Sequence, residues 1–263
     1  MTSSNGSSPW TFAPGDGPVV AAAIHAGDRL RPEVLRHIAL SPPERLREED
    51  PYTDKWTTVA DSRVVVHRSR FEVDLNRPRE RAIYAAPIDA WGLKVSEGPV
   101  PAEVVEGSLR LYDRFYLELS ALLDATAERW PRVLVLDLHS YNHRRAGPGE
   151  PPADPITNPE VNIGTVGADR QQWGPLIDRF AEALRSCEVS GHQLDVRENV
   201  NFRGGHLVRW IADRYPTVCP LAVEVKKIYM DELTGVLHPD VCREVHRALD
   251  AATETCRQDL KGG

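Results

Sequence analysis

Two histidines follow predicted strands, and imidazole is a side chain that commonly binds metal ions. His139 comes directly after an apolar run at residues 133–138, in the sequence LDLHSYN. His25 comes directly after a second apolar run at residues 18–24. Short apolar runs of this kind are typical of buried strands in a parallel sheet, and such sheets bind ligands where their strands end. We therefore expect His25 and His139 to converge on a single divalent cation.

The third ligand of such a site is expected to be a carboxylate. A catalytic zinc ion takes three protein ligands, drawn from imidazole and carboxylate groups, and keeps a fourth position for water. Asp28 lies three residues after His25, a spacing at which a turn can bring both side chains to one ion. Asp54 lies at the expected start of a helix, in the sequence EDPYTD. Each aspartate could instead cap a helix, and spacing alone does not separate the two candidates.

Glu224 is the candidate acid or base. It lies near the end of an apolar strand predicted at residues 217–225. A buried carboxylate is costly unless it is paired, bound to a metal or used in catalysis. We interpret Glu224 either as the ion-pair partner of an arginine beneath the sheet, or as a general base that takes a proton from metal-activated water.

Asn76 and Arg77 precede a proline and have two interpretations. The Asn-Arg-Pro sequence is good turn chemistry. Alternatively, an arginine can hold a carboxylate through two parallel hydrogen bonds while a neighbouring amide fixes its orientation. The pair is therefore a candidate for binding the carboxylate of a substrate.

Further candidates for substrate contact lie in two other segments. The sequence NFRGG at residues 201–205 predicts a turn before a helix, where glycines let the backbone approach a ligand closely. Arg203 in this turn could add positive charge to a pocket. The residues that follow the His139 motif, His143, Arg144 and Arg145, could contact an acidic side chain of a ligand.

Strands and helices alternate along the chain. Apolar residues at helical spacing predict an amphipathic helix at residues 101–128. Other patterns predict helices at residues 173–184, 205–214 and 239–257, and strands at residues 18–24, 63–67, 133–138, 193–197 and 217–225. Residues 142–167, rich in glycine and proline, predict a long loop of the kind that often forms a lid or a binding loop. The alternation predicts an α/β fold whose largely parallel sheet is covered on both faces.

Composition narrows the class of protein. With 263 residues, 41% of them hydrophobic, the chain can bury one large core, expected over residues 17–263 after a disordered tail at residues 1–16. The net charge of -7 argues against nucleic-acid binding. No apolar run reaches the roughly 18 residues of a membrane helix. The start of the chain lacks signal-peptide order. The four cysteines show no C-x-x-C spacing, so we expect reduced thiols in a cytoplasmic protein.

Six segments, in this order, resemble the N-formylglutamate amidohydrolase family, which is related to the zinc carboxypeptidases. They are residues 25–27 (HAG), 50–54 (DPYTD), 73–77 (VDLNR), 136–140 (LDLHS), 201–205 (NFRGG) and Glu224. The resemblance implies a three-layer, phosphorylase/hydrolase-like α/β fold with a mixed, largely parallel central sheet. It also implies one zinc ion and hydrolysis of the amide bond of a small N-acyl amino acid such as N-formylglutamate.

The resemblance also implies roles for individual residues. By similarity to the carboxypeptidases, His139 is the later histidine ligand and Glu224 is the general base. Asn76 and Arg77 would bind the α-carboxylate of the substrate. Tyr141, next to the zinc-binding motif, is placed in the substrate site.

The same comparison favours Asp54 over Asp28 as the carboxylate ligand. Carboxypeptidases have a glutamate three residues after their first histidine, where this chain has the shorter Asp28. The segment 50–54 is instead a feature of the formylglutamate type, which favours Asp54. Arg203, in the 201–205 motif, is expected to contact the substrate.

Three other functions remain as alternatives. A metallocarboxypeptidase or peptide amidase could use the same site. A non-catalytic ligand-binding protein could share the fold, although binding alone would need no general base. A serine hydrolase based on Ser140 is disfavoured, because no G-x-S-x-G sequence surrounds that residue.

Overall fold

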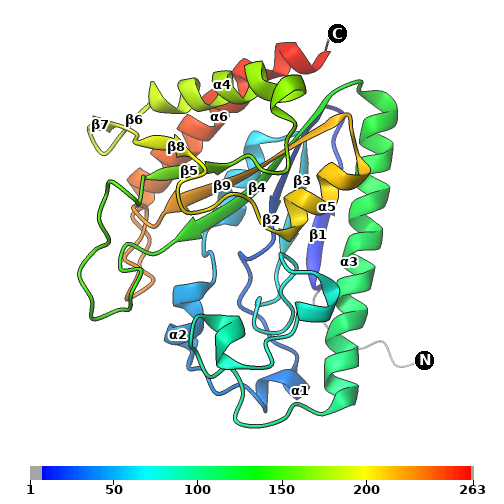
Figure 1. Ribbon diagram of the computed structural model, residues 1–263, viewed down its shortest axis with the longest axis vertical. Helices are drawn as coiled ribbons and strands as arrows, with labels where there is room; N and C mark the ends of the chain where they lie inside the picture. The colour runs from blue at the N-terminus through cyan, green and yellow to red at the C-terminus, as the bar shows by residue number, and fades with distance from the viewer. Residues whose placement is uncertain (1–7, 262–263) are drawn as a thin grey trace.

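A mixed sheet forms the centre of the computed structural model, which describes residues 8–261 (Figure 1). Within these residues the sheet has seven strands, in the order β1-β3-β2-β4-β9-β5-β8. Strands β3, β2, β4 and β9 are parallel, whereas β1 and β5 each pair antiparallel with a neighbour. The strands are β1 (Trp10–Ala13), β2 (Val19–Ala23), β3 (Ser62–Val66), β4 (Val133–Tyr141), β5 (Val161–Gly164), β8 (Val196–Glu198), β9 (Val218–Lys226) and a separate pair, β6 (Glu188–Val189) and β7 (His192–Gln193). The predicted mixed, largely parallel sheet is confirmed.

Helices cover both faces of this sheet, so the expected three-layer architecture is confirmed (Figure 1). Helices α3 and α5 pack on one face, and α4 and α6 pack on the other. All four were predicted from the sequence, within a few residues of their bounds. The helices are α1 (Pro32–Leu35), α2 (Pro42–Glu48), α3 (Ala102–Arg129), α4 (Arg170–Arg185), α5 (His206–Arg214), α6 (Pro239–Lys261) and three 3-10 helices, η1 (Thr53–Val59), η2 (Arg79–Arg81) and η3 (Pro87–Ala90).

Strand β4 is buried along its whole length, which explains why its sequence is nearly all apolar. Alternate side chains of a strand point to opposite faces of the sheet. Leu136 accordingly belongs to the apolar cluster that contains Phe180 of α4. Val135 belongs to the cluster on the other face, with Phe115 of α3. The central strand is thus fixed from both sides, and it presents His139 near its carboxyl end.

Two strands of the seven-stranded sheet lie where the sequence predicted none. Strand β1 falls within the expected tail at residues 1–16, and that part of the prediction is wrong. The segment pairs with β3, and Trp10 is buried. The centroids of the Trp10 and Phe115 rings are 5.6 Å apart. Residues 1–7, the rest of the tail, lie outside the described residues. Strand β5 lies in the predicted loop at residues 142–167, where its four residues pair antiparallel with β9.

Two other sequence features can be checked directly. No helix within residues 8–261 is both long enough and apolar enough to span a bilayer. The four cysteines, Cys187, Cys219, Cys242 and Cys256, all lie in the described part of the chain and are unpaired.

Gly27 allows the segment after β2 to approach the end of β3, and it carries the first prediction. A Cβ atom at this position would lie 2.1 Å from the carbonyl carbon of His67. Because the two backbones would have to separate, we expect Gly27→Ala to lower the free energy of unfolding by about 1–3 kcal/mol. Urea denaturation measures this change. Gly98→Ala is the control, since a Cβ there meets nothing within 4 Å; an equal loss in both variants would contradict the prediction.

Candidate metal centre and its cavity

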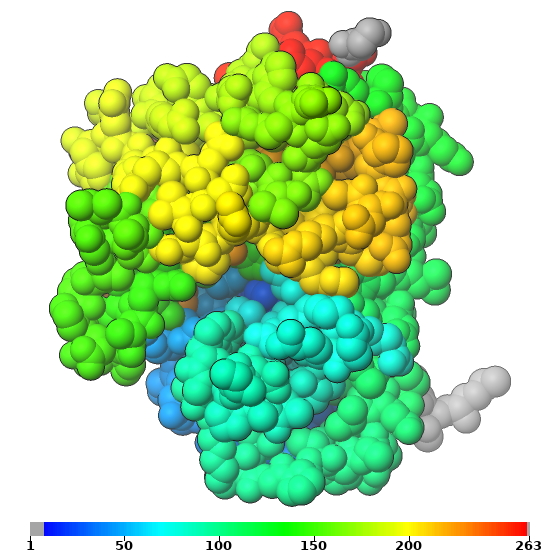
Figure 2. Space-filling model, in the orientation of Figure 1, coloured from blue at the N-terminus to red at the C-terminus, as the bar shows by residue number. Residues whose placement is uncertain are grey.

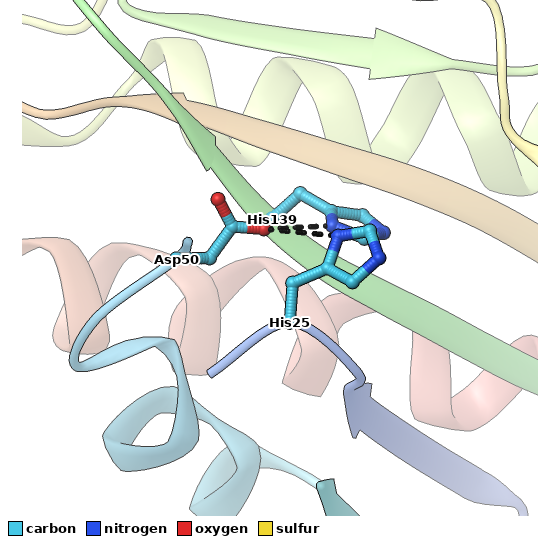
Figure 3. Close-up of side chains that lie close together, drawn as sticks. All are labelled: His25, Asp50 and His139. Atoms are coloured by element: carbon cyan, nitrogen blue, oxygen red, sulfur yellow. Dashed lines mark hydrogen bonds and ion pairs between the residues drawn. The ribbon is translucent and has the colours of Figure 1, made fainter. Parts of the chain in front are cut away.

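Two imidazoles and one carboxylate meet beyond the ends of the central strands. One ligand atom from each of His25, Asp50 and His139 lies within 4.8 Å of the others, and all three residues are buried (Figure 3). Asp50 Oδ2 lies 2.9 Å from Nδ1 of His139 and 3.5 Å from Nδ1 of His25. The centroids of the two rings are 4.8 Å apart. The expected convergence of His25 and His139 is present.

The segment that carries Asp50 is held in place by its backbone. The amide of Asp50 donates a hydrogen bond to the carbonyl of His25, at 2.9 Å. The buried ammonium group of Lys227, directly after β9, donates to the carbonyl oxygens of Arg47, at 2.6 Å, and Glu49, at 2.9 Å. Burial lowers the pKa of Lys227 to about 8. Because these bonds hold the backbone at Asp50 and just before it, they fix its carboxylate against the two imidazoles.

Each imidazole has a second carboxylate on its far side. Nε2 of His25 lies 2.8 Å from Oδ1 of Asp74, and Nε2 of His139 forms an ion pair with Oδ2 of Asp137 at 3.0 Å. Outer carboxylates of this kind hold a proton on the far nitrogen and leave the near nitrogen free for a metal. Among the described residues, Nδ1 of His25 is buried and has no hydrogen-bond partner. The donor set therefore fits a divalent cation bound by the two Nδ1 atoms and by Asp50.

The amide of Asn76 lies beside this cluster with a fixed orientation. Its Oδ1 accepts a hydrogen bond from the backbone N–H of Leu207 at 3.0 Å, so its NH₂ group faces Nε2 of His139, 3.2 Å away. If Nδ1 of His139 held an ion, Nε2 would carry the proton and could not accept from Asn76, so the Asn76 amide would be free to donate to a ligand. Gly205 permits this arrangement, because a Cβ there would lie 2.2 Å from Oδ1 of Asn76.

The charges of the cluster stabilise one another. Burial by itself would raise the pKa of Asp50, but hydrogen bonds and charge from His139 and His25 lower it below its usual range. Burial by itself would lower the pKa of His139, but the carboxylates of Asp137 and Asp50 raise it well above its usual value. The carboxylates of Asp50 and Asp137 therefore favour positive charge at this place, which a bound cation would supply.

Glu224 lies beside the His-Asp-His cluster, on β9, the strand that pairs with β4. It is half-buried on β9 and pairs in register with His139 on β4. Burial raises the pKa of Glu224 to about 7, although the charge of His139 opposes this shift. Within residues 8–261 no lysine or arginine forms an ion pair with Glu224, so the structure does not favour the ion-pair interpretation. A carboxylate that titrates near neutral pH suits a general base.

A cavity of about 790 Å³ opens in front of these groups. It is lined by the cluster, by Glu224 and Asn76, and by three aromatic side chains: Trp91, Tyr141 and Phe202. Figure 2 shows a hollow between the yellow-to-orange part of the chain, around residue 205, and the cyan part, around residue 75. The cavity is large enough for a small substrate.

The two aspartates proposed as metal ligands lie elsewhere. Asp54 is exposed in η1, and Asp28 is exposed in the segment after His25. Neither belongs to the cluster, and neither lines the cavity. Within η1 the buried residues turn toward the core, which leaves Asp54 facing solvent. Asp50, the first residue of the same sequence motif, takes the position that we expected for Asp54.

Arg77 also lies outside the cavity. Its Nε is 3.3 Å from Oδ2 of Asp74, and its Nη2 donates to the carbonyl of Asp89 at 2.5 Å. The guanidinium group also lies 4.6 Å from the ring centre of Tyr84. Because Arg77 is occupied by these contacts, only its neighbour Asn76 is placed to meet a ligand.

The other candidates for substrate contact divide into two groups. Arg203 and Tyr141 line the cavity, as does Arg145. Tyr141 is buried, with its hydroxyl bonded to the carbonyl of Pro159. The remaining two candidates, His143 and Arg144, do not line the cavity, and their backbone amides bond to Glu232.

The fold and the site together define a three-layer α/β domain with a candidate His-Asp-His metal centre in a cavity. The profile of the N-formylglutamate amidohydrolase family matches residues 17–230. The chain belongs to this family, which is a family of hydrolases.

Solved structures agree with the fold. The chain is similar to an N-formylglutamate amidohydrolase from Ralstonia eutropha, with 19% identity over 96% of this chain and 98% of that one, and a TM-score of 0.73. A gene product of Agrobacterium tumefaciens is similar at 15% identity, over 95% of this chain and 96% of its own, with a TM-score of 0.64. A comparison with curated proteins gives no match.

Proposed function

We propose that this protein is a zinc-dependent amidohydrolase that hydrolyses the amide bond of a small N-acyl amino acid. N-formylglutamate is the first substrate to test, because the family and the Ralstonia eutropha protein both carry that name. The observation that carries the proposal is the buried cluster of His25, Asp50 and His139, with Glu224 beside it. A ligand-binding protein would not need a carboxylate of raised pKa at this place.

Zinc is the metal that suits the donor set best. Two imidazoles and one carboxylate, with a position left open, are typical ligands of catalytic zinc. His25 and His139 would bind through Nδ1, and Asp50 through a carboxylate oxygen. When bound, the ion would polarise the scissile carbonyl group and lower the pKa of water at the site.

The side chains of this protein would then carry the proton. Glu224 accepts a proton from the water that attacks the carbonyl carbon of the substrate. A C–O bond forms, the C–N bond breaks, and Glu224 delivers the proton to the nitrogen of the leaving amine. The amide of Asn76, with its orientation fixed by Leu207, orients the substrate. The products are a carboxylic acid and a free amino acid.

Metal content and activity test this proposal together. We expect one zinc per chain, hydrolysis of N-formylglutamate, loss of this activity with a chelator and its recovery with zinc. The substrate panel should include blocked dipeptides, since faster turnover of these would indicate a carboxypeptidase or peptide amidase. A chain that hydrolyses no N-acyl amino acid with zinc bound would contradict the proposal.

A further inference from the structure

The cavity contains more arginine than the proposed chemistry uses. Five arginines line it: Arg47, Arg70, Arg145, Arg203 and Arg209. A guanidinium group cannot lose its charge in a protein, so each one needs an anion, a polar partner or water.

Two of the five are already occupied by the protein. Arg70 donates to Oδ2 of Asp74 at 3.0 Å and to the carbonyl of Glu48 at 3.1 Å. Arg47 lies 3.5 Å from a carboxylate oxygen of Glu48 and 3.9 Å from one of Glu232. These two arginines are therefore part of the protein's own ion-pair network.

The other three have no anionic partner within the described residues. Arg145, Arg203 and Arg209 are exposed to the cavity, and the side chains of all three are free of ion pairs and hydrogen bonds in residues 8–261. Arg145 lies 4.8 Å above the ring centre of Phe202, a cation–π contact that leaves its charge uncompensated.

Arg203 and Arg209 flank the wall of the cavity that holds Asn76. Gly205 contacts the amide of Asn76, and Arg209 follows Gly205 by four residues, one turn further along α5. Residues at this spacing share a helix face. Arg203 precedes the helix in the same turn. Both arginines therefore come from the segment that forms the Asn76 side of the cavity.

Within residues 8–261 these arginines form no ion pair with the acidic residues that line the cavity, which are Glu44, Glu48, Asp50 and Glu224. Glu44 also lines the cavity, but it belongs to α2, which Figure 1 shows well away from α5. Its carboxylate accepts hydrogen bonds from the amide and the hydroxyl of Ser41, each at 2.7 Å, and so caps that helix. Three unpaired guanidinium groups are more than a ligand with one carboxylate would need.

We propose that Arg203 and Arg209 are specificity-determining residues that bind the side-chain carboxylate of a dicarboxylic N-acyl amino acid. Arg145 faces the same ligand from the loop after β4. This inference rests on the proposed function for its choice of substrate, but the charge pattern that supports it belongs to the cavity itself.

Replacement of one arginine tests the assignment through substrate preference. N-formylglutamine differs from N-formylglutamate by an uncharged amide in place of the side-chain carboxylate. Hydrogen bonds to charged groups are worth enough that we expect Arg209→Gln or Arg203→Gln to lower the preference for N-formylglutamate by roughly 10–100-fold. This change should appear mainly in KM, with zinc content unchanged. An equal loss for both substrates would overturn the assignment.

Arg214→Gln is the matched control. Arg214 lies on the same helix, does not line the cavity, and has its guanidinium group 4.6 Å from the ring centre of Trp210. Its replacement should leave the substrate preference as it is in the wild type.

Binding of glutarate separates this inference from the proposed function. We expect calorimetry to show that glutarate binds the zinc-loaded chain more tightly than butyrate, and that Arg209→Gln removes the difference. A chain that prefers glutarate to butyrate, loses this preference in Arg209→Gln, and hydrolyses no N-acyl amino acid would contradict the proposed function and support the arginine subsite. Hydrolysis of N-formylglutamate that is indifferent to both arginines, or a wild type without preference for glutarate, would refute the subsite.

Discussion

We expect replacement of Asp50 with alanine to abolish the proposed zinc binding, whereas the same change at Asp54 should leave it intact. Asp50 Oδ2 lies within 3.5 Å of the Nδ1 atoms of both His25 and His139, so among residues 8–261 it is the one carboxylate placed between them. Loss of an outer-shell partner alone weakens metal binding about 10–100-fold, and loss of a ligand should weaken it by more. Competition with a chromophoric chelator measures the dissociation constant.

Asp54→Ala and Asp28→Ala are the controls for this experiment. Both residues are exposed and lie outside the cluster, so zinc affinity should match that of the wild type. Circular dichroism checks that the Asp50→Ala chain remains folded. Unchanged zinc affinity in a folded Asp50→Ala chain would show that the cluster is not the metal site.

Replacing Glu224 with glutamine should lower kcat by roughly two to four orders of magnitude, the usual contribution of acid–base catalysis. Glutamine has the size of glutamate but cannot accept the proton of the attacking water. Because Glu224 is outside the His-Asp-His cluster, zinc content should remain the same. Turnover of N-formylglutamate at saturation, with metal analysis of the same sample, measures both quantities.

Glu44→Gln is the matched control for Glu224. Glu44 is another glutamate of the cavity, and glutamine can replace it in the capping box of α2. Turnover close to that of the wild type is expected. Near-normal kcat in Glu224→Gln would remove the general-base role from this residue.

The long elements could be predicted because their patterns repeat. Helix α3 shows apolar residues at helical spacing over many turns, and β4 is a continuous apolar run buried on both faces. Strand β5 has only four residues, and its pairing with β9 is a long-range contact that leaves no local pattern. Strand β1 is similar, since it is stabilised by Phe115, about a hundred residues later in the chain.

The candidate site was predictable where its residues follow a clear local pattern, and not where long-range contacts place them. His25 and His139 follow predicted strands, so the direction of the sheet brings them to one edge. Asp50 was missed because the resemblance pointed to the 50–54 segment as a whole, and the sequence does not show which of its two aspartates faces the histidines. Lys227 holds Asp50 in place through hydrogen bonds to the carbonyl groups of two preceding residues, Arg47 and Glu49. These bonds form only in the folded chain. Competition of Asp74 for Arg77 is equally invisible in the sequence.

Lys227 has a consequence for how the site tolerates movement. It follows Glu224 by three residues along the same stretch of backbone, and it holds the loop that carries Asp50. The end of β9 therefore carries the proposed general base and also anchors the proposed carboxylate ligand. The hydrogen bonds of Lys227 therefore tie the position of Asp50 to the strand that carries Glu224.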